Sequence, residues 1–189
     1  MFGVPKVLAT YEVCRGSHSI SKSLGPVVSD LDPPIEDRCH VRTIMGTFGR
    51  PVNEVKTPAE LIEAIIHAFI GYSNILGNGW IHRDVSYGNI LLLGEPEKRD
   101  LDILTRLCDK CIAMIIDGDQ AVQWPVNNSP VDNQRTGTLP FISMRLAAIW
   151  DTLQPVEHSF HDDHESFIWI LLWTIILILS KLRQLLTIV

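Results

Sequence analysis

One stretch constrains the fold of this chain more than any other: residues 80–93, which read WIHRDVSYGNILLL. Its polar first part is followed at once by the apolar run Ile90–Leu93, which has the composition of a buried strand. A second apolar run lies in residues 112–119, IAMIIDGD, and it leads into the carboxylates of Asp117 and Asp119. Two successive apolar strands with polar residues at their ends predict a hairpin that holds functional side chains at one end.

The polar residues around this hairpin have the chemistry that phosphoryl transfer needs. The carboxylate of Asp84 can orient a hydroxyl nucleophile. Asn89 and Asp117 each carry a hard oxygen ligand of the kind that Mg²⁺ prefers, and the ion in turn carries the phosphates of a nucleotide. The spacing of these three residues therefore favours a nucleotide-dependent phosphotransferase.

Four motifs carry a family resemblance, and they occur in the expected order. HRDVSYGN resembles the protein-kinase catalytic loop, H-R-D-x-x-x-x-N, and IDGD resembles the D-F-G element. Further on, RTGTLPFISMRL resembles the end of an activation segment with its peptide-docking loop, and HDDHESFIWILLW resembles the start of the central buried helix. In this combination the chain resembles the fungal-type protein kinase family from about Arg38 to Trp173.

This resemblance implies an α+β, protein kinase-like fold, mainly the helical large lobe with a remnant of the small-lobe sheet. Residues 1–48 would be the remnant of the small lobe and the hinge, and residues 49–189 a partial large lobe. Within the latter, the expected parts are the catalytic loop 82–89, the metal element 117–119, the activation segment 117–145 and a buried central helix 162–180.

The resemblance also assigns roles to individual residues. Asp84 would be the catalytic base, and Arg83 would pair with the activation segment. Asn89 and Asp117 would bind Mg²⁺ and, with it, the cofactor ATP. Thr138, in the substrate loop, would form a hydrogen bond near Asp84.

Two further residues would support the catalytic loop structurally, namely His82 and Asp163, whose carboxylate would hold the loop backbone. The implied reaction is transfer of the ATP γ-phosphoryl group to a serine or threonine of a protein substrate. Such a reaction depends mostly on positioning and charge neutralisation.

Several positions depart from the family pattern. No glycine-rich phosphate loop precedes residue 82, and no lysine lies in a V-A-I-K context. Gly118 replaces the phenylalanine of the metal element, and Arg145 reverses the charge of an expected buried glutamate. The chain also ends soon after the central helix, so we expect a truncated kinase with exposed apolar surfaces and marginal solubility or dependence on a partner.

Two other functions remain open at this point. The first is a small-molecule phosphotransferase of the aminoglycoside or choline kinase kind, because such enzymes often carry an I-D-x-D element, which Asp117 and Asp119 match. Arg83 and the long segment after Asp117 favour a protein substrate over this alternative. The second is a catalytically inactive pseudokinase that acts as a binding module, which the missing phosphate loop and lysine favour.

The local patterns predict a few secondary elements. Residues 4–13 and 39–48 are expected to form strands, and residues 49–51 a turn. A helix is expected over residues 57–79, because Thr57 suits the N-cap and Glu60 completes a capping box. His67 lies beside its apolar stripe and is interpreted as a packing residue.

Composition excludes several classes of partner. The formal charge of −6 and the pI of about 5.6 argue against nucleic-acid binding. The uncharged run 167–180 is shorter than a membrane span needs, so a buried helix is expected and membrane insertion is not. With residues 185–189, LLTIV, a short tilted span stays open as the alternative. The N-terminus has no signal-peptide pattern, so we expect an intracellular protein in the cytoplasm or nucleus.

Cys108 and Cys111 form an isolated C-x-x-C, for which we expect reduced thiols without zinc.

Overall fold

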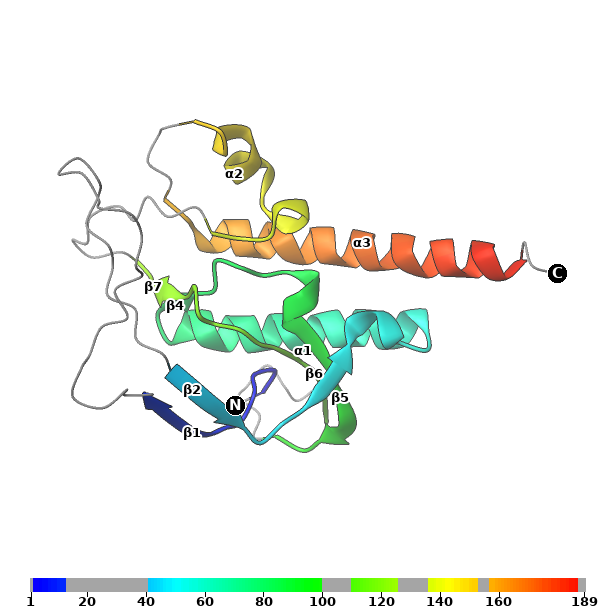
Figure 1. The fold of residues 1–189 in the computed structure, drawn as a ribbon, viewed down its shortest axis with the longest axis horizontal. Coiled ribbons are helices and arrows are strands. Elements are labelled where there is room, and N and C mark those ends of the chain that lie inside the picture. Colours follow the sequence, from blue (N-terminus) through cyan, green and yellow to red (C-terminus); the bar gives the residue numbers. More distant parts are fainter. Residues whose placement is uncertain (1, 13–40, 100–109, 126–135, 153–156, 187–189) are drawn as a thin grey trace, which may run out of the picture. The chain divides into compact units, whose positions relative to one another are not determined.

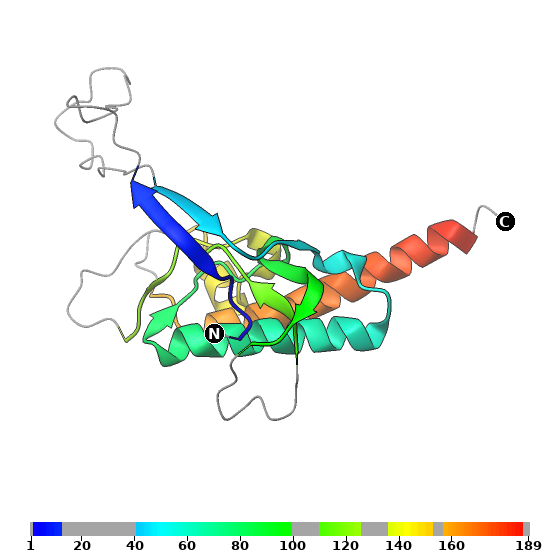
Figure 2. The same ribbon diagram turned by 90° about the horizontal axis from the view of Figure 1, so that it is seen from below.

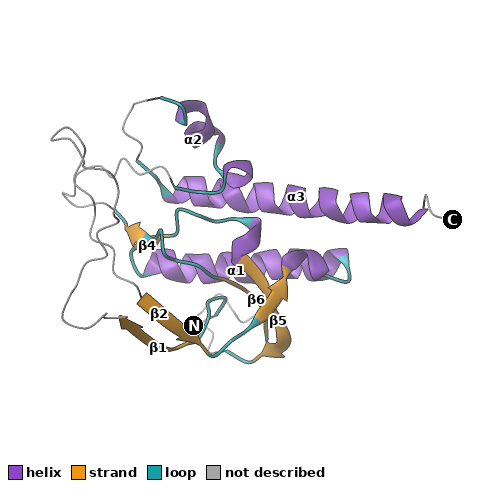
Figure 3. Cartoon of the chain, in the orientation of Figure 1, coloured by secondary structure: helices purple, strands orange, loops and turns teal. Residues whose placement is uncertain are grey.

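The computed structural model describes residues 2–12, 41–99, 110–125, 136–152 and 157–186 (Figures 1 and 3). The chain divides into two units: Lys6–Gly46 form one, and Met1–Pro5 together with Thr47–Val189 form the other. The mixture of helices and strands agrees with the expected α+β class. Of the predicted C-x-x-C pair, Cys108 lies outside the described residues, and Cys111 is a buried free thiol.

The smaller unit holds one antiparallel strand pair. Strand β1 (Val7–Glu12) pairs with β2 (Val41–Met45), with Val7 opposite Met45 and Glu12 opposite Val41. The backbone N–H of Gly46 donates to the Lys6 carbonyl at 2.8 Å at the open end of the pair. Both predicted strands are confirmed, within narrower limits than the sequence indicated.

The larger unit contains a three-stranded antiparallel sheet in the order β3-β5-β6. The predicted hairpin is confirmed by β5 (Ile90–Glu97) and β6 (Cys111–Ile115), in which Ile90 lies opposite Ile115. The turn predicted at residues 49–51 is wrong, because these residues form the edge strand β3 (Gly49–Pro51) beside β5. A Cβ on Gly49 would lie 2.6 Å from the Leu92 carbonyl oxygen, so glycine permits the close approach of the two strands.

The predicted helix is confirmed as α1 (Pro58–Gly77). The Thr57 side chain caps it by accepting a hydrogen bond from the Glu60 N–H at 3.1 Å. In the expected capping box, the Glu60 side chain would accept from the backbone N–H of Thr57. Instead, the Glu60 carboxylate accepts from the Lys56 N–H at 2.5 Å and pairs with Arg50. His67 is fully buried and its Nδ1 accepts from the Ile112 N–H at 3.1 Å, which confirms its interpretation as a packing residue.

The first residues of the chain lie against α1 and β6. The Gly3 carbonyl accepts the Ile115 N–H at 2.8 Å, and the Phe2 carbonyl accepts the Asn74 side-chain amide at 3.0 Å. A Cβ on Gly71 would lie 2.0 Å from the Gly3 carbonyl oxygen. The two backbones can therefore approach this closely only because both residues are glycines.

Helix α3 (Phe160–Leu186) runs antiparallel to α1, as Figures 1 and 2 show. The Phe167 ring packs edge-on against Tyr72 and Phe69 of α1. The expectation that this helix is buried all round is wrong for the described residues, since α1 and the elements beside it cover only one face. Ile170 and Thr174, on that face, are fully buried. Elsewhere on the helix the exposed apolar side chains are Ile168, Leu172, Trp173, Ile175, Ile176 and Leu179.

Among the described residues, the larger of two hydrophobic clusters joins α1, the sheet and the start of α3. Its buried members are Val52, Leu61, Ala64, Ala68, Tyr72, Val85, Ile90, Leu92, Ala113, Ile115, Phe141, Phe167 and Ile170. Each large apolar side chain buried there contributes about 1.5–3 kcal/mol, which fixes the ends of β5 and β6 that flank the polar loop. The short elements around this core are η1 (Val52–Glu54), β4 (Trp80–Ile81), η2 (Tyr87–Asn89), β7 (Val122–Gln123), η4 (Leu139–Phe141) and α2 (Met144–Ile149).

In the part of the chain that the structure describes, two helices are long and apolar enough to cross a membrane when judged by length and composition alone, namely α1 and residues Phe160–Ser180 of α3. The core helix of a soluble protein passes the same test, so this is weak evidence for a span. The aromatic contacts of Phe167 with α1 are what a packed core helix would make.

Candidate active site

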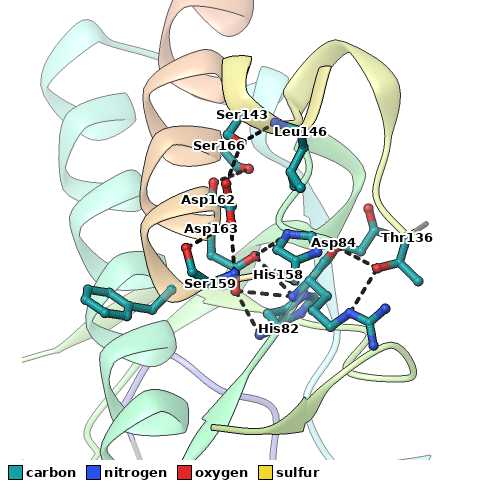
Figure 4. Close-up of polar contacts among 12 residues, drawn as sticks. His82, Asp84, Thr136, Ser143, Leu146, His158, Ser159, Asp162, Asp163 and Ser166 are labelled. Carbon is teal, nitrogen blue, oxygen red and sulfur yellow. Dashed lines mark hydrogen bonds and ion pairs between the residues drawn. The ribbon is translucent and has the colours of Figure 1, made fainter. Parts of the chain in front are cut away.

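The polar loop after β4 is held by one buried carboxylate. Asp163, in the first turn of α3, accepts the His82 N–H at 2.9 Å and the Arg83 N–H at 3.1 Å (Figure 4). Asp163 is 1% exposed, so these backbone donors replace water as its hydrogen-bond partners. The start of α3 thereby fixes the position of a loop 80 residues earlier in the chain.

Two residues of the site have left-handed backbone conformations. Arg83 has a φ of 67° and Asp117 a φ of 65°, and they are the two non-glycine residues with positive φ in the described part of the chain. Such conformations cost on the order of 1 kcal/mol or more for residues with a side chain. Both residues lie where the loop or a strand ends. The surrounding hydrogen bonds must therefore stabilise their left-handed conformations.

His82 connects the loop to the strand end that precedes Asp117. Its Nε2 lies 2.9 Å from the Ile116 carbonyl oxygen, which can only accept, so Nε2 carries the proton. Burial lowers the pKa of this imidazole, although the Ile116 carbonyl and the carboxylates of Asp84 and Asp117 act in the opposite direction. His82 is therefore a neutral bridge between the two halves of the site.

Asp84 receives hydrogen bonds from two sides. The Thr138 hydroxyl donates to its Oδ1 at 2.8 Å, and the Asn89 side-chain amide donates to its Oδ2 at 3.2 Å. The same amide also donates to the Asp84 carbonyl at 2.8 Å. The carboxylate is half-buried and is thus held in one orientation with part of its surface open.

Arg83 contacts the segment that contains Thr138. Its Nε donates to the Thr136 hydroxyl at 3.1 Å, and the residue is only 5% exposed. The loop and the segment that begins at Thr136 are therefore joined twice, through Arg83 and through Asp84. These are the two contacts that the sequence led us to expect.

Asn89 and Asp117 come from neighbouring strand ends. Asn89 directly precedes β5 and Asp117 follows β6, and the Ile116 N–H donates to the Asn89 carbonyl at 2.9 Å. Asp117 is exposed, and the amide nitrogen of Asn89 is engaged by Asp84, which leaves its oxygen as the remaining acceptor. An amide oxygen and a carboxylate are ligands of the kind that Mg²⁺ takes, with its other ligands supplied by phosphates and water.

Within the described residues, no group of three or more His, Cys, Asp or Glu side chains is arranged to bind a metal. The pair of Asn89 and Asp117 differs from such a protein-only site, because phosphate oxygens would complete its ligand set.

A buried histidine that the sequence did not single out lies beside the loop anchor. The Nε2 of His158 lies 3.9 Å from Asp163 Oδ1, and its side chain is 10% exposed. Burial lowers the pKa of His158 to about 4. Burial also raises the pKa of Asp163 to about 6, against the opposing effect of the Arg83 and His82 N–H donors.

Asp162 is the second residue that sequence reasoning missed. It is 2% exposed and accepts hydrogen bonds from Ser143, Arg145 and Ser159. The doublet of aspartates in HDDHES was a signal, but only the second was given a role at the site. Adjacent residues on a helix point in different directions, so two neighbouring acids can hold two different segments.

The loop after β4, the hairpin that follows it and the segment that returns to Asp84 meet at one place in the structure. A family model described as fungal protein kinase matches residues 7–175. The chain therefore belongs to the fungal protein kinase family. A comparison with curated proteins gave no match.

Proposed function

We propose that this chain transfers the γ-phosphoryl group of ATP to a serine or threonine hydroxyl of a protein. The observation that carries the proposal is the hydrogen bond between Thr138 and Asp84, which are 54 residues apart. This bond holds the segment that begins at Thr136 against the loop that contains Asp84. A protein kinase needs its acceptor-binding segment in register with the residue that orients the acceptor hydroxyl.

Asp84 would orient the attacking hydroxyl and accept its proton. Asn89 and Thr138 donate to the two different oxygens of this carboxylate, so its rotation is restricted before substrate arrives. Restricting a reacting group in this way lowers the entropic part of the barrier. Arg83 supports the arrangement by donating to Thr136.

Asn89 and Asp117 would hold the magnesium ion. When bound, Mg²⁺–ATP supplies the phosphoryl group and the charge that neutralises its oxygens. The left-handed backbone of Asp117, next to the Ile116 carbonyl that His82 binds, sets the direction in which its carboxylate leaves β6.

A protein substrate is favoured over a small molecule by the two contacts that join the loop to the segment after Thr136. A small-molecule phosphotransferase has no need of a long segment docked on Arg83 and Asp84. The binding-module alternative keeps two sequence features in its favour, because neither a glycine-rich phosphate loop nor a V-A-I-K lysine precedes the catalytic loop.

Calorimetry and a phosphotransfer assay together test the proposal. We expect Mg²⁺-dependent ATP binding to the full chain that is lost in Asp117→Ala, with Asp119→Ala as a matched acidic control that retains it. Transfer to a generic protein substrate should disappear in Asp84→Asn, while ATP binding remains. A folded wild-type chain that binds no ATP would contradict the proposal and favour the binding module.

A further inference from the structure

The Asp162 carboxylate accepts hydrogen bonds from three residues, Ser143, Arg145 and Ser159. Its Oδ1 accepts from the Ser143 hydroxyl at 2.5 Å and from Arg145 Nε at 3.2 Å. Its Oδ2 accepts from an Arg145 terminal nitrogen at 2.6 Å, from the Ser159 N–H at 2.8 Å and from the Ser159 hydroxyl at 2.9 Å. Burial acts to raise the pKa of Asp162, but the hydrogen bonds from Arg145, Ser143 and Ser159 outweigh it and lower this pKa.

Arg145 binds Asp162 with two nitrogens, which is the strongest form of this ion pair. Its guanidinium also donates to the Glu157 carbonyl at 2.8 Å. The Asp162 side chain is 3% exposed and that of Arg145 is 51% exposed. A buried carboxylate is therefore paired with a guanidinium group on a half-exposed side chain. The arginine that reverses the expected charge at this position therefore has an acidic partner nearby.

The partners of Asp162 lie where the segment after Thr138 ends. Ser143 is the N-cap of α2, and its hydroxyl accepts the Leu146 N–H at 3.2 Å while it donates to Asp162. Glu165, one turn further along α3, accepts the Met144 N–H at 2.8 Å. Two acids of α3 thus hold the first turn of α2.

Both ends of residues 138–145, which we call the docking loop, are therefore anchored. Thr138 is bound to Asp84 at one end, and Ser143 and Arg145 are bound to Asp162 at the other. Figure 4 shows Asp162 with Ser143 above it and Asp163 with His82 below it, on the same turn of α3. One turn of helix sets the relative position of the catalytic loop and the docking loop.

We propose that Asp162 and Arg145 are a positioning pair that holds the docking loop in register with Asp84 and so governs the binding of the protein substrate, not of the nucleotide. This inference rests on the proposed protein kinase function. Neither residue touches the substrate hydroxyl or the phosphates in this role. Both act through the backbone of the docking loop.

The test compares Arg145→Met with Arg145→Lys and with Arg50→Met in the full chain. Methionine keeps the unbranched apolar stem of the side chain but removes all donors, and lysine restores a charged ammonium group without the bidentate geometry. Arg50→Met is the matched control, because Arg50 also pairs with a carboxylate, Glu60, far from the docking loop in sequence. Hydrogen exchange of residues 136–152 is measured alongside the KM for a protein substrate and the affinity for Mg²⁺–ATP.

Arg145→Met is expected to reduce the exchange protection of the Leu146 amide about ten-fold and to raise the KM for protein by a similar factor. ATP affinity should change by less than about two-fold, and lysine should recover part of both losses. Arg50→Met should match the wild type in all three measurements.

Unchanged protection at residues 136–152 in Arg145→Met would overturn the inference whether or not the chain is active. Equal losses of ATP affinity and protein affinity would also overturn it, because they would indicate general destabilisation. If the wild-type chain phosphorylates no protein, the proposed function fails, while the exchange measurement still decides whether the pair anchors the docking loop.

Discussion

The carboxylate of Asp163 accepts a hydrogen bond from the backbone N–H of Arg83, a residue whose φ is 67°. A buried acid and a left-handed backbone conformation stabilise each other in this contact. Without the Arg83 N–H, Asp163 would lose a donor that burial makes hard to replace. The loop that carries Asp84 is therefore fixed by α3 and not by its own sequence alone.

Replacing Asp163 by alanine is expected to loosen this loop. The change leaves the N–H groups of His82 and Arg83 buried without an acceptor, which costs about 1–3 kcal/mol for each group. Urea denaturation should show a lower free energy of unfolding by several kcal/mol. Asp163→Asn, which keeps one acceptor oxygen, is the control and should lose less; equal stability of all three proteins would contradict the role of the contact.

Gly71→Ala is expected to displace the first residues of the chain. The new Cβ would lie 2.0 Å from the Gly3 carbonyl oxygen, an overlap with backbone that typically costs about 1–3 kcal/mol to relieve. Gly77→Ala in the same helix is the control, because nothing lies within 4 Å of its Cβ position. Alanine there should be neutral or stabilise the helix by up to about 1 kcal/mol, so denaturation curves that shift equally for both variants would refute this packing.

His158 is expected to make stability depend on pH. Its pKa is about 4 in the folded chain against an ordinary value of 6.5, because burial disfavours the charged imidazole. As pH falls, the unfolded chain therefore binds the proton before the folded chain does. The contribution of His158 to the free energy of unfolding is complete above pH 6.5 and is lost between pH 6.5 and 4. Asp163, whose folded pKa is raised to about 6, acts in the opposite direction across pH 3.8 to 6.

Comparing the wild type with His158→Gln separates these two effects, because Asp163 is common to both proteins. Relative to the wild type, the variant should gain up to about 3 kcal/mol in free energy of unfolding as pH falls from 6.5 to 4. Chemical denaturation at several pH values measures this difference. A difference that stays constant with pH would show that His158 titrates normally.

The exposed apolar face of α3 is expected to limit solubility. Ile176 is 62% exposed and Leu179 is 59% exposed, whereas Ile170 on the opposite face is fully buried. Changing Ile176 and Leu179 together to glutamine should reduce self-association in light scattering without lowering the melting temperature. Ile170→Gln should instead destabilise the fold strongly, by a few kcal/mol, because it buries an unpaired amide. A large drop in melting temperature for the double variant would mean that this face is packed.

The sequence by itself determined the local parts of the protein. The polar spacing from His82 to Asn89, the apolar runs on either side and the cap at Thr57 predicted the loop, the hairpin and α1 at nearly the right residues. These features follow from side-chain periodicity and capping, which act over a few residues and can be recognised along the chain. The spaced motifs also identified the family, which matches residues 7–175.

Only the tertiary structure decided which distant segments meet. Residues 49–51 became a strand because β5 offered an unpaired edge, and Glu60 turned from its expected capping partner to Lys56 and Arg50. Arg145 found its partner in Asp162, and α3 was left covered on one face, because the described residues supply a surface for that face alone. Long-range pairing depends on the shapes and charges of two surfaces at once, and neither surface exists until the chain has folded.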